Sequence, residues 1–245
     1  MTYDGRGLRF GSVAEQYDLF RPSPPPEVST ILGDLGGLKV LEVGTGKWTR
    51  LLLELGADVT VVEPDDDMRA VLVRRSPQMH ALKGAAEALP VDDATFDAVL
   101  VSSAWHWFEQ PAATNEMARV LRDNSQLFIL WNGFSGEVPW VVSLLALRER
   151  PNDPGKRPRG WAAEFGVGSE FVVESDVELD WTWTRTIDEV ISGFGTYSGV
   201  IIRGDEEREE MESEVRRRLE ARAVNGIVEV PMTVRGTIAR RRARA

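Results

Sequence analysis

The sequence predicts an α/β fold in which a doubly wound, largely parallel sheet is covered by helices on both faces. Strand-like and helix-like patterns alternate over residues 36–135, and the strands there read as continuous apolar runs. Such runs are typical of parallel strands that are buried on both sides. Further along, apolar and charged residues alternate in two strands, which indicates an antiparallel pair closing one edge of the sheet. The helical segments outside the sheet predict a cap.

The stretch Lys39–Arg50 (KVLEVGTGKWTR) joins the first predicted strand to a helix through Gly44-Thr45-Gly46. Glycines let a backbone approach a ligand closely, and the free N–H groups at a helix start favour a negative group. Glu63 ends the second apolar run, nineteen residues after Gly44. An acid at this spacing, on the tip of the next strand, is placed to accept hydrogen bonds from ribose hydroxyls. The first half of the chain therefore predicts a nucleoside-cofactor site.

The elements of the first half follow from their periodicity. A helical lead-in carries Phe10, Tyr17 and Phe20 and must end before the proline-rich run at 22–26. A second helix is expected at 26–35. Strands are expected at 38–43, 58–63, 78–82, 96–102 and 126–131, and helices at 47–55, 65–74 and 111–121.

The second half begins with a helix at about 137–149 and a loop at 151–160 that is rich in Pro, Gly and charge. Helices near 187–194 and 204–222 are expected between two alternating strands. In the strand at 171–183 the apolar residues are expected to share one face: Phe171, Val173, Val177, Leu179, Trp181 and Trp183. In the last strand the corresponding face carries Val228, Val230, Met232, Val234 and Ile238.

The composition sets limits on function. The 245 residues carry a net charge of -10, which argues against nucleic acid and anionic membranes as partners. No cysteine and only two histidines are present, so neither a disulfide nor a zinc site is expected. No stretch is apolar and long enough to span a bilayer, and the N-terminus lacks a signal-peptide pattern. A cytoplasmic monomer or homodimer with a small-molecule substrate is expected.

Three runs carry a resemblance to a known family: LEVGTGKWTRLLLELGADVTVVEPDDDM, GAAEALPVDDATFDAVLVSSAWHWFE, and ARVL with ILWN. They resemble the class I S-adenosylmethionine-dependent methyltransferases, in particular the small-molecule branch related to trans-aconitate methyltransferase. The resemblance implies a Rossmann-like sheet of seven strands with an antiparallel last hairpin. It also implies lid helices over 1–35, a cofactor-binding core over 36–135, a helical cap with the sixth strand (about 170–183) over 136–225, and a last strand with a basic tail over 226–245.

The resemblance also assigns roles to residues of this chain. Glu42 is expected to orient the glycine loop and Glu63 to hold the ribose hydroxyls of S-adenosylmethionine, with S-adenosylhomocysteine as the product. The cofactor is expected to contact Arg21, Glu42, Gly44, Thr45, Gly46, Glu63, Pro64, Asp65, Met68, Ala86, Glu87, Ser102 and Ser103. The acceptor is expected to contact Tyr17, Trp105, Trp107, Trp131 and Tyr197. His106 is either the catalytic base or a packed wall residue.

The glycine loop departs from the family pattern. Close relatives carry E-x-G-x-G-x-G before Lys-x-Thr, whereas this chain reads Glu42-Val-Gly-Thr-Gly-Lys-Trp48-Thr49. Either two residues are missing from the loop, which alignment through Lys47 and Thr49 favours, or Trp48 fills the third glycine position. A shorter loop offers fewer N–H groups to the cofactor carboxylate, and an indole there would fill the methionine slot.

Three functions remain open at this point. The first is methyl transfer from S-adenosylmethionine to a small molecule. The second is a cyclase, lyase or isomerase on the same fold, in which the cofactor is structural, differently used or lost, because a fold does not determine a reaction. The third is a binding or regulatory module without catalysis.

Overall fold

The computed structural model describes residues 10–148 and 170–243. The predicted loop at 151–160 lies outside the described residues. Seven strands form one sheet in the order β3-β2-β1-β4-β5-β7-β6. The strands are β1 (Lys39–Val43), β2 (Asp58–Val62), β3 (His80–Leu82), β4 (Phe96–Ser102), β5 (Leu121–Phe134), β6 (Phe171–Thr186) and β7 (Ile227–Arg241).

The strand directions agree with the predicted doubly wound sheet. The neighbours from β3 to β5 pair in parallel, whereas β7 pairs antiparallel with both β5 and β6. The antiparallel hairpin at one edge, predicted from the alternation near the end of the chain, is therefore confirmed.

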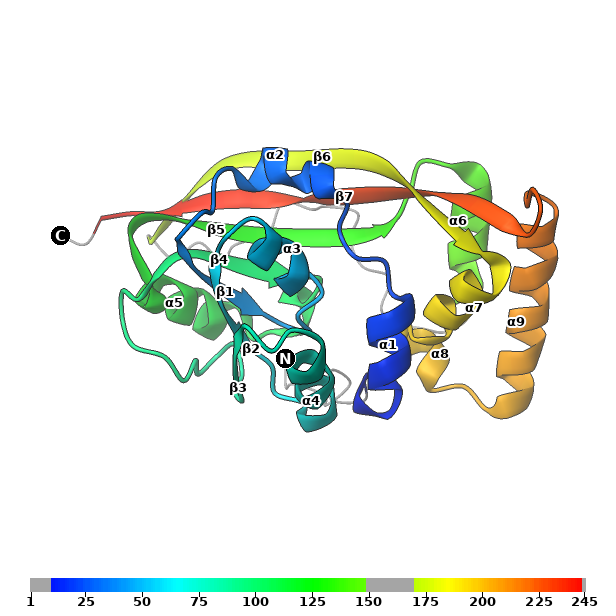
Figure 1. Ribbon diagram of the computed structural model, residues 1–245, viewed down its shortest axis with the longest axis horizontal. Coiled ribbons are helices and arrows are strands. Elements are labelled where there is room, and N and C mark those ends of the chain that lie inside the picture. Colours follow the sequence, from blue (N-terminus) through cyan, green and yellow to red (C-terminus); the bar gives the residue numbers. More distant parts are fainter. Residues whose placement is uncertain (1–9, 149–169, 244–245) are drawn as a thin grey trace.

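Helices connect the strands and lie on both sides of the sheet (Figure 1). The α-helices are α1 (Ala14–Phe20), α2 (Ser29–Leu32), α3 (Thr49–Glu54), α4 (Asp66–Arg75), α5 (Gln110–Val120), α6 (Pro139–Ala146), α7 (Ile187–Gly195), α8 (Ser198–Ile201) and α9 (Asp205–Glu220). The 3₁₀ turns are η2 (Phe10–Val13), η3 (Pro26–Val28) and η4 (Trp105–Trp107). The helix expected at 26–35 is shorter and divided, because it starts as a 3₁₀ turn at prolines and ends at Gly33, whose φ is +72°.

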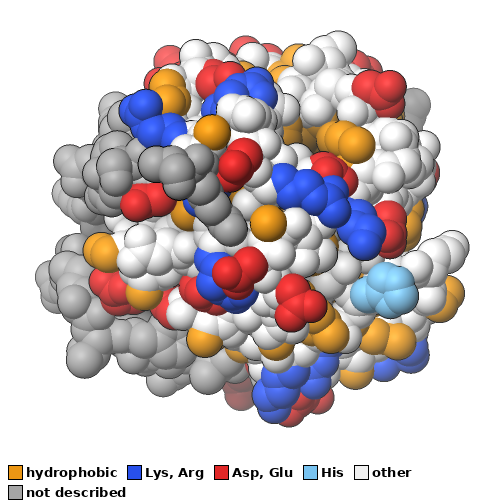
Figure 2. Space-filling model, turned by 90° about the vertical axis from the view of Figure 1, so that its left-hand side faces the viewer, with side chains coloured by type: hydrophobic (Ala, Val, Ile, Leu, Met, Phe, Trp, Pro, Cys, Tyr) orange, Lys and Arg blue, Asp and Glu red, His pale blue; other side chains and the backbone are white. Residues whose placement is uncertain are grey.

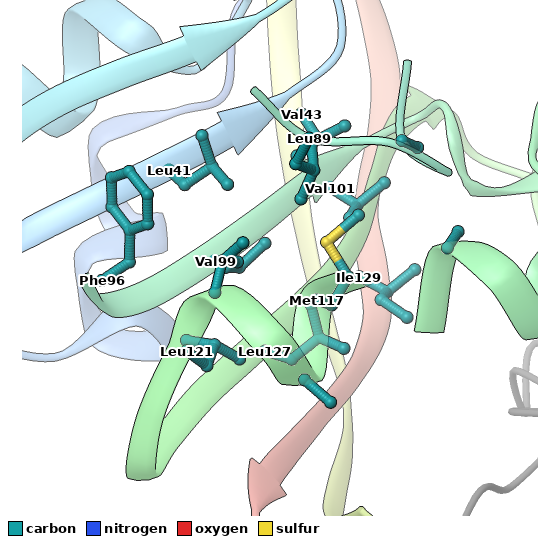
Figure 3. Packing of buried hydrophobic residues seen from close by; sticks show 14 of the residues in the cluster. Leu41, Val43, Leu89, Phe96, Val99, Val101, Met117, Leu121, Leu127 and Ile129 are labelled. Carbon is teal, nitrogen blue, oxygen red and sulfur yellow. The ribbon is translucent and has the colours of Figure 1, made fainter. Parts of the chain in front are cut away.

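Two hydrophobic clusters cover the two faces of the parallel strands. Consecutive residues of β1 point to opposite sides, so that Val40 belongs to one cluster and Leu41 to the other. The α5 cluster, on one face, joins β1, β4 and β5 to Met117 of α5, as Figure 3 shows. The α3 cluster, on the other face, includes Leu52 of α3. Burial on both faces explains why these strands read as continuous apolar runs.

A third cluster, the cap cluster, forms where the strands extend beyond the parallel core. At the right of Figure 1, α6, α7, α8 and α9 gather around the end of β6 and the start of β7. Val141, Phe194, Val215, Leu219 and Val228 are buried there. The apolar stripe of α9 is thin, yet Met211, Val215 and Leu219 all face this cluster, so it suffices to attach the helix.

The apolar residues of 171–183 were predicted to share one face of the sheet, and this prediction was wrong for the start of β6. Register with β7 shifts between Val173 and Ser175, which marks a β-bulge. Phe171 consequently packs in the α5 cluster, whereas Val177 and Leu179 pack against the α3 cluster on the opposite face. One extra residue reverses the inward and outward positions of every later side chain.

Surface charges of both signs are interleaved on the face shown in Figure 2. Arg119 pairs with Asp93 at 2.8 Å and with Glu116 at 2.7 Å, and Arg122 pairs with Asp97. The more exposed of these pairs, Arg119–Asp93, contributes little to the free energy of unfolding.

Candidate active site

The carboxyl ends of β1, β2 and β4 meet at one edge of the sheet. Val43 is in register with Val62 of β2 and Val101 of β4, so the residues that follow these strands emerge together. The N–H of Gly44 donates to the Val62 carbonyl at 3.1 Å. The structure thus brings Gly44, Glu63 and the end of β4 together, at the edge where open α/β sheets bind ligands.

Glycine is needed at both ends of the loop. Gly44 and Gly46 have φ values of +132° and +73°, which residues other than glycine rarely adopt. A Cβ on Gly46 would lie 2.5 Å from Cδ1 of Leu72 in α4. A Cβ on Gly44 would lie 3.4 Å from the Ser102 carbonyl oxygen, which shows how closely the loop approaches the end of β4.

Glu42 lies beneath the loop and is fully buried. Its carboxylate accepts hydrogen bonds from the N–H of Trp48 at 3.1 Å and from Oγ1 of Thr49 at 2.7 Å. These bonds tie the loop to the first turn of α3. Burial raises the pKa of Glu42 to about 7, against the opposing effect of these hydrogen bonds.

The indole of Trp48 lies in the α3 cluster and is 1% exposed. The alternative in which this indole fills the methionine slot is therefore wrong. The side chain points into the core because it follows the loop at the start of α3, where the helix packs on the sheet.

Glu63 is at the tip of β2 and is 5% exposed. Its Oε1 accepts the N–H of Asp65 at 2.8 Å, and burial raises its pKa to about 7. Asp65 in turn caps α4 by accepting the N–H groups of Asp67 and Met68, each at 3.0 Å. Pro64 stands between the two acids. The turn holds the Glu63 carboxylate at the edge of the site.

Helix α1 covers the glycine loop, as the placement of its side chains shows. Oγ1 of Thr45 lies 3.4 Å from the Tyr17 hydroxyl, and Nζ of Lys47 donates to the Asp18 carbonyl at 2.8 Å. Burial lowers the pKa of Lys47 to about 8. A cavity of about 10 Å³ remains between α1, the loop and Met68 of α4. This volume is enough for about one water molecule.

The end of β4 leads into the predicted aromatic wall. Ser103 has a φ of +50°, an uncommon value for serine, and its N–H donates to the Leu130 carbonyl at 2.8 Å. Trp105 is 2% exposed and packs in the α5 cluster, so it lies in the core. The ring of His106 lies 4.6 Å from that of Trp107, and Trp107 makes an edge contact with Phe10 at 6.4 Å.

Other predicted site residues face structural partners. Ala86 is buried in the α5 cluster, and the Glu87 carboxylate accepts the N–H of Glu109 at 2.8 Å. Trp131 is half-buried and packs against the same cluster.

Arg21 and Tyr197 come together although 176 positions separate them in the sequence. Nε of Arg21 donates to Oγ1 of Thr196 at 2.7 Å, and its guanidinium carbon lies 3.5 Å from the centroid of the Tyr197 ring. Arg21 was expected at the cofactor, but the structure places it against the cap. The sequence-based reasoning missed Arg148, whose guanidinium carbon lies 4.5 Å from the same ring centroid.

Lys47 and Asn132 were also missed. Nδ2 of Asn132 donates to the Pro22 carbonyl at 3.1 Å, and its Oδ1 accepts Nε1 of Trp181 at 3.0 Å. Asn132 thereby connects the lead-in, β5 and β6. The positions of Lys47 directly after the glycine loop and of Asn132 at the end of the ILWN motif were usable signals, whereas no local pattern points to Arg148.

Within the described residues, neither a membrane-spanning helix nor a metal-binding group of side chains is found. No helix in 10–148 or 170–243 is apolar and long enough to cross a membrane. Over the same residues, no group of three or more His, Cys, Asp or Glu side chains is arranged to hold a metal ion.

Comparison with known proteins shows what this chain is similar to. Residues 41–129 match the family described as methyltransferase domain. An uncharacterized methyltransferase of Mycobacterium tuberculosis is 43% identical over 149 residues, which is 60% of this chain and 61% of that protein. An uncharacterized methyltransferase of Schizosaccharomyces pombe is 27% identical over 85% of this chain and 86% of its own length. A solved structure described as a putative type II methyltransferase from Anaeromyxobacter dehalogenans superposes with a TM-score of 0.58, at 20% identity, over 91% of this chain and 98% of that one.

The fold is Rossmann-like, with a mixed seven-stranded sheet and an antiparallel last hairpin, and it is shared with the Anaeromyxobacter structure. Residues 41–129 and the sequence relatives show that this chain is similar to methyltransferases. The chain aligns with 61% of the length of the mycobacterial relative.

Proposed function

We propose that this protein transfers a methyl group from S-adenosylmethionine to a small-molecule acceptor. The observation that carries the proposal is the buried Glu63 at the tip of β2, beside the glycine loop after β1. A carboxylate held there is suited to accept hydrogen bonds from the two ribose hydroxyls of a nucleoside. The methyltransferase match over 41–129 covers both features and supports the same function.

The chain's residues fit such a cofactor at the loop as well. Gly44 and Gly46 carry no side chain at two positions of the loop, and Glu42 accepts a hydrogen bond from the backbone that follows it. S-adenosylmethionine supplies an electrophilic methyl group on a sulfonium. The residues around it have the task of positioning, because an in-line displacement gains much of its rate from the alignment of the reacting atoms. His106, in η4 after β4, is proposed to accept a proton from the acceptor.

We further propose that the glycine loop is two residues shorter than in the branch related to trans-aconitate methyltransferase. Trp48 in the core supports this alignment, because the indole then occupies an ordinary core position at the start of α3. The protein is proposed to act in the cytoplasm, as a monomer or homodimer, without nucleic acid or membrane as partners.

Titration calorimetry with S-adenosylhomocysteine tests the cofactor site directly. The unmodified protein should bind it, and Glu63→Ala should weaken binding by about a hundredfold, because two hydrogen bonds to a charged group are lost. Asp58→Ala, at the other end of β2 and exposed, is the matched control and should bind normally. Absence of binding to the unmodified protein, or equal binding by Glu63→Ala, would contradict the proposal.

The departure of the glycine loop from the family pattern favours a second candidate, a non-methylating reaction on this fold. In this alternative the cofactor is structural, differently used or lost. Transfer of an isotope label from the donor's methyl group to any acceptor in a metabolite extract would decide for methylation.

A further inference from the structure

Two arginines from distant parts of the chain share one aromatic ring in the cap. The guanidinium carbon of Arg21, at the end of α1, lies 3.5 Å from the Tyr197 ring centroid. That of Arg148, after α6, lies 4.5 Å from the same point. Because both distances are measured to the same centroid, the two guanidinium carbons are at most 8.0 Å apart, which is the sum of 3.5 and 4.5 Å.

Neither guanidinium has a counter-ion within the part of the chain that the structure describes. No described carboxylate lies within ion-pair distance of Arg21 or Arg148. The nearest acid of α1, Asp18, is engaged with Arg75 at 3.1 Å. Two half-buried positive charges this close repel each other, and the low local dielectric strengthens the repulsion.

A third positive group adds to this cluster. Burial is the main cause that lowers the pKa of Lys47, and the charge of Arg21 lowers it further, against the opposing effect of Asp18. Arg21 therefore lies within electrostatic reach of both the glycine loop and the cap. An anion placed here would relieve the repulsion among the three side chains.

The ring and one guanidinium are held in place by their surroundings. Tyr197 makes ring contacts with Phe134 at 6.1 Å and Phe194 at 5.7 Å. Arg21 donates from Nε and Nη2 to Thr196, at 2.7 and 3.2 Å. Its Nη1, and every N–H of the Arg148 guanidinium, donates to no described residue. The free donors have the planar geometry that suits carboxylate and phosphate groups.

The arginine pair is connected to the proposed cofactor site through α1. The Arg21 guanidinium carbon lies 5.0 Å from the Tyr17 ring centroid, and the Tyr17 hydroxyl is the group that meets Thr45 of the glycine loop. Figure 1 shows α1 between α4 and the cap helices α7 and α8, as its contacts with α4 and α7 require.

We propose that Arg21 and Arg148, on the ring of Tyr197, form an oxyanion-binding subsite for the methyl acceptor. The acceptor is then a small molecule that carries a carboxylate or phosphate group, which the two guanidinium groups hold while another part of it faces the methyl donor. This assignment rests on the function proposed above.

Calorimetric titrations with simple anions test the subsite. Citrate, inorganic phosphate and the neutral triamide of citrate are titrated separately into the protein saturated with S-adenosylhomocysteine. Citrate or phosphate should bind and the triamide should not. Preference for one of the two anions identifies the oxyanion as carboxylate or phosphate. Arg148→Gln should weaken the anion's binding by about tenfold or more, and Arg148→Lys should restore part of it.

The control variant is Arg222→Ala. Arg222 also stacks on an aromatic ring, with its guanidinium carbon 4.7 Å from the centroid of Trp140, but it lies beyond α9 in the cap. This variant should bind the anion normally. The subsite would be disproved if neither anion binds the unmodified protein, or if Arg148→Gln binds the anion as tightly as the unmodified protein does.

Failure of the subsite and failure of the proposed function give different results. Binding of S-adenosylhomocysteine without any anion binding would remove the subsite and leave methyl transfer in place. Anion binding that depends on Arg148, measured on a protein that fails to bind S-adenosylhomocysteine, would keep the subsite and remove the proposed cofactor.

Discussion

At the scale of single residues, the two acids near the glycine loop differ in how they are enclosed. Both Glu42 and Glu63 are buried and have a pKa raised to about 7 by that burial. Glu42 receives two hydrogen bonds from the start of α3, on both of its oxygens. Glu63 receives one, from Asp65, among the described residues. Glu42 is therefore the structural acid, and Glu63 keeps capacity for a ligand.

Gly46 offers a residue-scale test of the loop. Gly46→Ala should lower the free energy of unfolding by about 2–4 kcal/mol, because alanine is strained at a φ of +73° and its Cβ displaces Leu72. Gly37 has nearly the same φ, +72°, but no atom within 4 Å of an added Cβ. Gly37→Ala should therefore cost only about 1–2 kcal/mol. Urea unfolding measures the stability of both variants. An equal loss of unfolding free energy in the two would show that the Leu72 side chain moves aside without an energetic penalty.

At the scale of elements, helix α1 covers the glycine loop and is the element whose opening would expose it. A cavity of about 10 Å³ remains between α1, the loop and α4. The exposed side of α1 is attached to α4 through an ion pair between Glu15 and Arg74. Few buried residues attach the helix, namely Ala14 and Tyr17, so local opening should be easy.

Locking α1 onto α4 should therefore block the site. The chain has no cysteine, so Glu15→Cys and Arg74→Cys can be joined selectively by a short bifunctional maleimide. The cross-linked protein should bind S-adenosylhomocysteine at least about tenfold more slowly, because each entry requires an opening that the link prevents. The same double variant blocked with a monofunctional maleimide is the control. Unchanged binding kinetics after cross-linking would exclude α1 as a lid.

The elements were the most predictable part of the molecule. Continuous apolar runs for β1, β2 and β4 follow from burial on both faces, and the alternation at the start of β7 follows from burial on one face. The β-bulge at 173–175 could not be predicted from the sequence. Phe171 and Val177 are an even number of positions apart, so simple alternation places them on the same face, and the pattern does not mark the extra residue between them. The meeting of Arg21 with Thr196 and Arg148 depends on tertiary folding over long separations, and no local pattern encodes it.

At the scale of the whole molecule, charge sets the pH range in which the fold is most stable. Acidic residues exceed basic ones by ten at neutral pH, and two of the acids, Glu42 and Glu63, are buried. A carboxyl whose pKa is higher in the folded than in the unfolded state binds more protons when folded. The free energy of unfolding therefore falls as the pH rises from about 4.5 to about 7 through these groups.

Glu42→Gln separates one of these two contributions. The amide can accept from Trp48 and donate to Thr49, so the loop contacts persist while the buried charge is removed. At pH 8 the variant should be more stable than the unmodified protein by about 1–3 kcal/mol, and near pH 4.5 the two should be equal. Urea unfolding at both pH values measures this, with Glu54→Gln on the exposed side of α3 as control. A variant that is less stable at pH 8 would contradict the assignment.

Strand β7 contributes side chains to every hydrophobic cluster described here. Its first residues, Val228 to Met232, belong to the cap cluster, Val234 and Ile238 to the α3 cluster, and Ala239 to the α5 cluster. The side chains that pack in the cap and those that pack on the two faces of the sheet thus lie along one strand, and not in separate blocks of sequence. An exchange of the whole cap cluster between related chains would separate the start of β7 from the rest of the same strand, so the cap of such proteins should diverge by point substitution more readily than by module exchange.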